Sequence, residues 1–319
     1  MLRHTQIRCV QIRHIQIKAS LNLLMAIVAI CFAASLNAKT YIGVMQGLAG
    51  EDFYQQQFDA QIQVIEESSN RLGSSTEITL FTGDKATRQD ALAWFEDMVE
   101  SVSTDDRVLF YFFGHGSYDD TDYKFNLHGP DLTGEELKQA FADLDVELKL
   151  LVNTSSSSGA LLELFEEESD TVLITATRSG RERIATRFGR YFVKALEDEA
   201  ADLDKNGTIS AKESYDYAER ETADFYTSEG LIATEHSVLQ GEHANLIALA
   251  SLVERPAIEA DSELAGLYQS RDEIDLEIER LRIRRIGMSE EDYRRDFQAL
   301  LIQLSVLQAQ IEELEGAGP

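Results

Sequence analysis

Residues 107–120 read RVLFYFFGHGSYDD, and the rest of the chain is best interpreted outward from them. The six apolar residues 108–113 are too few for a buried helix and are rich in strand-forming types. They predict a strand covered on both faces, at the centre of a parallel sheet. The strand leads directly into Gly114-His115-Gly116, and the two glycines allow His115 to lie on a tight turn at the strand's carboxyl end. Ligands bind at that edge of open α/β sheets, so His115 is a candidate acid or base.

Strand and helix patterns alternate on both sides of this stretch. Their order and spacing are typical of a parallel sheet with right-handed crossover connections. We therefore expect an α/β fold, in which a parallel sheet is sandwiched between helices on both faces. The expected strands cover residues 41–45, 77–81, 108–113, 147–152 and 171–176, and the expected helices cover residues 53–72, 90–102, 134–144 and 188–196.

A second polar turn follows the next expected strand, residues 147–152 (ELKLLV). Asn153 and Thr154 lead into four serines, residues 155–158, and then into Gly159 and the helical pattern ALLELF. Because parallel strands end at the same edge of a sheet, this turn should lie beside His115. Four consecutive serines form an undifferentiated polar run, which argues against a tuned nucleophile among them.

At these two turns the chain resembles the caspase and legumain superfamily of cysteine peptidases. In that superfamily one strand ends in His-Gly and the next ends in Cys-x-Ser-Gly. Counting back from Ser158-Gly159 places the nucleophile position at Ser156. The resemblance to bacterial legumain-like proteins continues through DYKFNLHGPDLT (122–133) and ITATRSGRERIATRFGRYF (174–192), and we place the resembling domain at residues 39–255.

The resemblance implies a role for each of three residues. His115 would be the base or acid, the backbone N–H of Gly116 an oxyanion donor, and Ser156 would stand where the nucleophilic cysteine is expected. A serine hydroxyl ionises far less readily than a thiol, and it needs a well-aimed base that has its own orienting group. The chain departs from the family's pattern here, because its two cysteines are Cys9 and Cys31.

The N-terminal segment has the form of a secretory signal. Its basic residues precede an uncharged apolar run, residues 21–34, and small residues follow, so cleavage is expected after Ala38 or Ser35. An uncleaved membrane anchor is the alternative, but an anchor needs about 20 apolar residues. We expect residues 1–38 to be a signal peptide, with a periplasmic or secreted location and no stable membrane insertion after cleavage. Both cysteines would be removed with it.

The charge of the chain narrows the choice of partners. It carries 29 Lys and Arg against 57 Asp and Glu, for a net charge of −28. A surface this acidic repels phosphate groups, so we expect no nucleic-acid partner and no attraction to an anionic membrane surface.

Residues 202–213 (DLDKNGTISAKE) match the twelve-residue calcium loop of EF-hand proteins. Oxygen-bearing side chains occur at the spacing that a seven-coordinate hard cation requires, and Gly207 stands at the sharp turn. The alternative is an acidic, solvated turn in a protein rich in Asp and Glu. We favour a structural Ca²⁺ site whose expected ligands are Asp202, Asp204, Asn206, Thr208, Ser210 and the bidentate Glu213.

Beyond Pro256 the pattern changes, and residues 256–319 predict a coiled-coil-like antiparallel helical hairpin. Gly287 should end the first helix and Ser289 should cap the second. The hairpin could pack on itself, on the domain or on another chain, so a helix-mediated oligomer or partner is one possibility. The second helix carries a heptad seam of Tyr293, Phe297, Leu300, Leu304, Leu307, Ile311 and Leu314.

Three functions fit these observations. The first is an inactive pseudopeptidase whose groove beside His115 and Ser156 binds a peptide or protein. The second is a Ser/His hydrolase, a peptidase or esterase that uses Ser156. The third is a calcium-stiffened structural module that acts through its helical hairpin. We rank them in that order, so a non-enzyme is favoured while enzymatic activity stays open.

Overall fold

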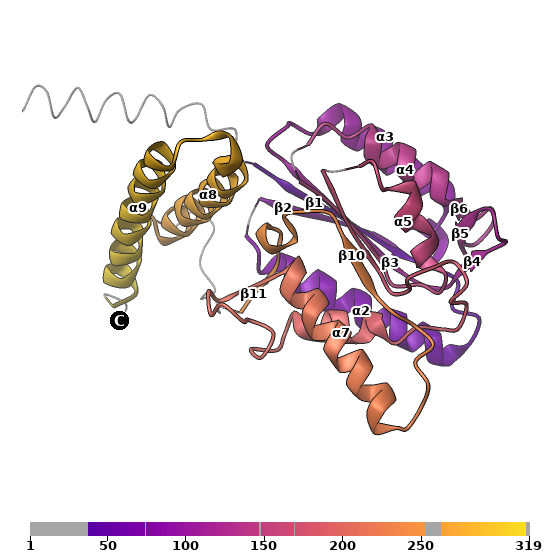
Figure 1. Ribbon diagram of the computed structural model, residues 1–319. Helices are drawn as coiled ribbons and strands as arrows, with labels where there is room; N and C mark the ends of the chain where they lie inside the picture. Colours follow the sequence, from indigo (N-terminus) through magenta and orange to yellow (C-terminus); the bar gives the residue numbers. More distant parts are fainter. Residues whose placement is uncertain (1–37, 74, 147, 169, 253–262, 317–319) are drawn as a thin grey trace, which may run out of the picture. The chain divides into compact units, whose positions relative to one another are not determined.

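The computed structural model describes residues 38–73, 75–146, 148–168, 170–252 and 263–316. Its main strands are β1 (Thr40–Gln46), β2 (Thr76–Phe81), β3 (Arg107–Phe113), β7 (Leu148–Asn153), β8 (Thr171–Thr175) and β10 (Val238–Gln240). They form one sheet in the order β10-β8-β7-β3-β1-β2 (Figure 1). The strands β2, β1, β3, β7 and β8 pair in parallel, and β10 pairs antiparallel with β8 at the edge.

Helices cover both faces of this sheet, which confirms the α/β sandwich that the sequence predicts. They are α2 (Asp52–Asn70), α3 (Arg88–Ser101), α4 (Gly134–Ala142), α5 (Leu161–Leu164), α6 (Phe188–Ala195) and α7 (Ala211–Ser228). The helices α3, α4 and α5 lie on one face, and α2 and α7 lie on the other (Figure 1).

The side chains of β3 alternate between two hydrophobic cores, because successive residues of a strand point to opposite faces. Leu109, Tyr111 and Phe113 belong to the core under α2, α6 and α7. Val108, Phe110 and Phe112 belong to the core under α3, α4 and α5. Each of these six side chains is at most 1% exposed, as expected for a central strand covered on both faces.

Side-chain caps fix where several helices begin. The hydroxyl of Thr87 accepts the Asp90 N–H at the start of α3. Thr133 and Glu136 form a capping box at the start of α4. Arg88 pairs with Glu136 and so links α3 to α4, and this ion pair holds the pKa of Glu136 at about 2.

The sequence did not predict six short strands, one of which is β10, the antiparallel edge strand of the main sheet. β4 (Gly116–Tyr118), β5 (Tyr123–Phe125) and β6 (Leu132–Thr133) form a small antiparallel sheet directly after the His-Gly turn. β9 (Thr208–Ser210) pairs with β11 (Ala248–Ser251) beside the predicted calcium loop. Segments of two to four residues are too short to show a strand period in the sequence. The described residues also contain four short 3₁₀ helices: η1 (Gly83–Lys85), η2 (Ser158–Ala160), η3 (Ala244–Leu246) and η4 (Arg285–Gly287).

Two long helices follow, α8 (Glu263–Arg284) and α9 (Glu290–Gly316). They run antiparallel, since the Tyr268 hydroxyl near the start of α8 donates to Glu315 near the end of α9 over 2.5 Å. Ser289 accepts the backbone N–H of Asp292 and begins α9. Among the described residues, no helix is long and apolar enough to cross a membrane. The predicted signal peptide, residues 1–38, lies outside the described residues except for Ala38. Residues 253–262, where the predicted boundary between the domain and the hairpin falls, also lie outside them.

Candidate functional site at the carboxyl edge of the sheet

His115 lies where the sequence predicts, on the turn after β3, but its ring faces α2. The imidazole packs edge-on against Tyr54 and Phe58, with ring centroids 4.7 and 5.5 Å apart. The crevice at this point has a volume of only about 10 Å³, enough for one water molecule at most. Gly114 is required beside it, because a Cβ there would lie 2.8 Å from the Cα of Gly47. The crevice on this side of the ring therefore has no room for a substrate group, whereas His115 itself is half-buried.

Ser156 lies at the end of the neighbouring strand and is 4% exposed. Its hydroxyl donates to the carbonyl oxygen of Gly116 over 2.9 Å, and the Gly116 N–H points back to Ser156 Oγ at 3.4 Å. The structure therefore brings Ser156 and Gly116 together. Within the described part of the chain, no hydrogen bond joins His115 to Ser156.

The run of four serines looks uniform in the sequence, but in the structure each serine has a different environment. Ser155 is buried, donates to Asn153 Oδ1 over 2.8 Å, and lies 2.7 Å from the hydroxyl of Tyr123. Ser157 has a left-handed backbone with φ of 60°. Ser158 Oγ accepts the N–H of Ala176 at the end of β8. Identical residues thus follow different backbone directions around one tight turn.

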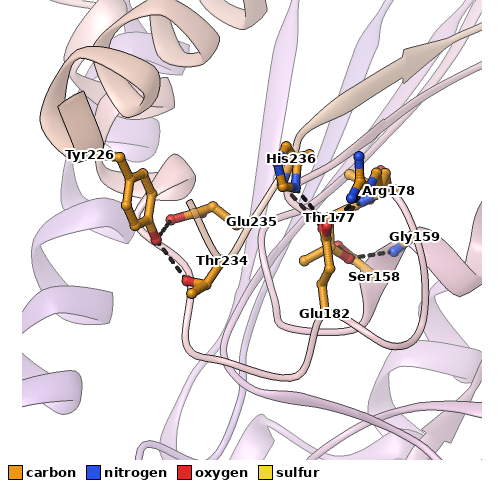
Figure 2. Close-up of polar contacts among 10 residues, drawn as sticks. Ser158, Gly159, Thr177, Arg178, Glu182, Tyr226, Thr234, Glu235 and His236 are labelled. Carbon is orange, nitrogen blue, oxygen red and sulfur yellow. Dashed lines mark hydrogen bonds and ion pairs between the residues drawn. The ribbon is translucent and has the colours of Figure 1, made fainter. Parts of the chain in front are cut away.

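Hydrogen bonds join the serine turn, residues 155–159, to the segment that follows β8. Gly159 N–H donates to Thr177 Oγ1 over 2.8 Å, as Figure 2 shows. A Cβ on Gly159 would lie 2.1 Å from the backbone nitrogen of Ser179, so no other residue fits this position without moving the backbone. The Ser157 N–H donates to the carbonyl oxygen of Glu182 over 2.8 Å. The segment that carries Glu182 therefore sets the position of the serine turn.

The carboxylate of Glu182 connects two segments beside the turn (Figure 2). It accepts the backbone N–H of Arg178 at 3.0 Å and that of His236 at 3.1 Å. The Arg178 guanidinium lies 3.1 Å from the same carboxylate, and His236 Nδ1 lies 2.6 Å from it. Spacing in the sequence gave His236 no role, because its partner lies 54 residues away. The signal that could have indicated this pair is the family stretch 174–192, which contains Glu182.

Glu235, next to His236, is a buried carboxylate at the start of α6. It accepts the backbone N–H of Arg187 at 2.8 Å and of Phe188 at 3.0 Å, and the hydroxyl of Tyr226 at 3.0 Å. Burial raises the pKa of Glu235, although these three donors oppose the shift. The free backbone N–H groups at a helix start are thereby satisfied inside the protein.

Replacing Glu235 with glutamine should lower the free energy of unfolding by about 2 kcal/mol, because the new NH₂ group faces buried N–H donors. The loss should be greatest near pH 4. The raised pKa means that the Glu235 carboxyl binds its proton more tightly in the folded chain than in the unfolded chain. The stability that native Glu235 contributes is therefore greatest at low pH and falls as pH rises through the folded-state pKa. Urea unfolding of the native protein and of the Glu235→Gln variant, from pH 4 to pH 8, measures the difference between their free energies of unfolding. A loss that grows with pH would contradict it.

The predicted calcium loop brings three carboxylates together. Oxygen atoms of Asp202, Asp204 and Glu213 all lie within 4.8 Å of one another. Asp202 and Glu213 are buried, and Gly207 adopts a left-handed φ of 82° at the turn. Asp202 accepts the backbone N–H groups of Asn206 and Gly207 over 3.1 and 3.0 Å. Three hard anionic oxygen donors of this kind fit a cation such as Ca²⁺.

The other expected calcium ligands, Asn206, Thr208 and Ser210, form hydrogen bonds with residues of the same loop. Asn206 Oδ1 accepts the N–H and hydroxyl of Thr208. The Ser210 hydroxyl donates to Glu213 over 2.7 Å, and the two residues form a capping box at the start of α7. Asn206 Nδ2 also donates to Asp204 Oδ2 over 3.0 Å, so Asn206 lies beside the carboxylate cluster.

A His-Gly turn and a Ser-Gly turn at the ends of adjacent parallel strands, in a sheet covered on both faces, define a caspase-like α/β domain. The chain belongs to the peptidase C13 family, the legumain family, whose family model matches residues 35–246. It is also similar to the crystal structure of protein GSU0716 from Geobacter sulfurreducens, at 13% identity and a TM-score of 0.42. That similarity covers 63% of this chain and 92% of the other. No curated protein matches the chain.

Proposed function

We propose that this member of the peptidase C13 family is a catalytically inactive pseudopeptidase that binds a peptide or protein ligand. One observation carries the proposal: the Ser156 hydroxyl donates to the Gly116 carbonyl, whereas the His115 ring packs against Tyr54 and Phe58. A serine nucleophile requires a base aimed at its proton. The sequence adds that residues 39–319 contain no cysteine to act instead.

The ligand would bind in a hollow at the same edge of the sheet. This hollow has a volume of about 240 Å³ and lies at the carboxyl ends of β1 and β2, where Leu48, Ala49, Gly83 and His128 line it. Small-molecule pockets usually measure about 300–1,000 Å³, so the hollow suits one or two side chains of an extended peptide. Leu48 is 45% exposed there and offers an apolar contact.

Peptides selected from a random display library on the immobilised protein should bind through this hollow. Leu48→Asp should weaken their binding at least tenfold, because it places a charge where an apolar contact forms. Val99→Asp on α3 is the matched control, since Val99 is also 45% exposed and lies outside the hollow, and it should change affinity less than twofold. Equal effects of the two substitutions, or cleavage of the selected peptides, would refute the proposal.

A structural calcium ion would accompany this function. The carboxylates of Asp202, Asp204 and Glu213 would hold it, and it would connect the loop before β9 to the first turn of α7. A calcium-dependent domain is suited to a location where calcium is abundant. The signal-like residues 1–38 support the periplasm or the cell exterior as that location.

A further inference from the structure

The helix α9 carries a second apolar stripe that the hairpin does not cover. Ala299, Ile302, Val306 and Ala309 follow one another at spacings of three, four and three residues. At about 100° per residue, this stripe lies about 150° around the helix from the seam that contains Leu300 and Leu304. All four residues of the stripe are exposed, Ile302 at 57% and Val306 at 54%. We call these four residues the outer stripe.

The charge distribution indicates what could cover the outer stripe. Residues 298–310 (QALLIQLSVLQAQ) contain no charged residue, although 27% of the chain is charged and its net charge is −28. This uncharged segment spans about 20 Å of helix. Two copies of so acidic a chain repel each other over most of their surfaces, so they can approach closely only along a neutral face.

The outer stripe is also self-complementary. In an antiparallel pairing centred on Leu304, residues equally far from it face each other across a two-fold axis. Ile302 then faces Val306 of the second copy, and Ala299 faces Ala309, where small side chains allow the helices to approach closely.

The charges beyond the neutral segment follow the same symmetry. Arg295 and Glu313 lie nine residues on either side of Leu304, and both are exposed. Each would face its opposite charge on the second copy, at both ends of the pairing. Within its own chain Arg295 also pairs with Asp292 and Asp296, at 2.6 and 2.8 Å.

We propose that the outer stripe of α9 is a homodimer interface, in which it packs antiparallel on the outer stripe of a second copy of this chain. The dimer requires nothing of the hollow lined by Leu48 and His128, so its test is independent of the peptide-binding proposal. Its few apolar side chains make it a reversible dimer, with an expected Kd in the micromolar range, about 10 μM.

Sedimentation equilibrium of the purified protein from about 1 to 200 μM, a range chosen to bracket that Kd, tests the interface. The native chain should change from monomer to dimer across this range. Ile302→Glu should keep it monomeric, because both copies would place a carboxylate in the apolar contact. The residue is exposed in the monomer, so the far-ultraviolet circular dichroism of the variant should be unchanged.

Charge exchange tests the antiparallel register. Arg295→Glu and Glu313→Arg should each weaken the dimer about tenfold, because each places like charges opposite one another at two points. The double variant should restore the native Kd. Arg294→Glu, which makes the same charge change one residue off the outer stripe, should alter Kd less than threefold. A native chain that stays monomeric at 200 μM, a dimer that survives Ile302→Glu, or a double variant without recovery would overturn the proposal.

Discussion

Adding 1 mM Ca²⁺ to the metal-free protein should raise its midpoint of thermal unfolding by about 5–10 °C. A ligand that binds only the folded state at about 100 times its Kd stabilises that state by about 2.7 kcal/mol. Each kcal/mol corresponds to about 2–4 °C in a domain of this size. The site that should produce the shift is the cluster of Asp202, Asp204 and Glu213. Differential scanning calorimetry with and without calcium measures it.

Glu213→Gln should remove most of the calcium-dependent shift, because it takes away the ligand that can bind through two oxygens. Glutamine can still complete the capping box with Ser210, so the start of α7 should survive the substitution. The two oxygens of Glu213 also accept the backbone N–H groups of Leu203 and Ser210, so the metal-free variant should lose about 2 kcal/mol of unfolding free energy, as for Glu235→Gln. The calcium-dependent shift is therefore measured against each protein's own metal-free midpoint. Glu219→Gln makes the same chemical change at an exposed position on α7 and should leave the shift intact.

Three results would count against the calcium site. They are no shift with calcium, an equal shift with magnesium, or a full shift in the Glu213→Gln variant. Magnesium is the informative comparison because it is smaller, prefers near-octahedral geometry and gives up its bound water reluctantly, so a site shaped for calcium should bind it more weakly.

The sheet and the clustering of carboxylates in residues 202–213 could be predicted because their information is local in the sequence, whereas calcium binding by that loop stays a prediction. The loop's residues lie within twelve positions, and the apolar run 108–113 identified β3 by itself. Parallel pairing then required His115 and Ser156 to lie at neighbouring strand ends, as the pairing of β3 with β7 bears out. The family assignment, made from the order of the motifs, is likewise confirmed.

The direction of the side chains at that edge could not be predicted in the same way. Whether the His115 ring turns to Ser156 or to α2 depends on Tyr54 and Phe58, about sixty residues earlier in the chain. The contact between Glu182 and His236 likewise forms only once the segment after β8 and the segment before β10 lie side by side. Such contacts arise from tertiary packing, and no spacing within the sequence records them.

Replacing Ser156 with cysteine should give a thiol that reacts with iodoacetamide, whereas native residues 39–319 contain no thiol to react. The variant should take up one equivalent of the reagent, slowly, because Ser156 is 4% exposed. Ser117→Cys is the reference, since Ser117 is exposed on β4 outside the serine turn. At pH 6.5 an ordinary thiol is only about 1% ionised, so an activated thiolate would react far faster than this reference.

We expect the Ser156→Cys variant to react at least tenfold more slowly than the Ser117→Cys variant and to cleave no peptide. The His115 ring packs against Tyr54 and Phe58, so we expect it not to draw the proton from residue 156. Faster labelling at residue 156 would show that the imidazole reaches it, and the inactive geometry would then be wrong. The native protein offers the converse test. Labelling by a fluorophosphonate, or peptide hydrolysis, that Ser156→Ala abolishes would establish a Ser/His hydrolase in place of a pseudopeptidase.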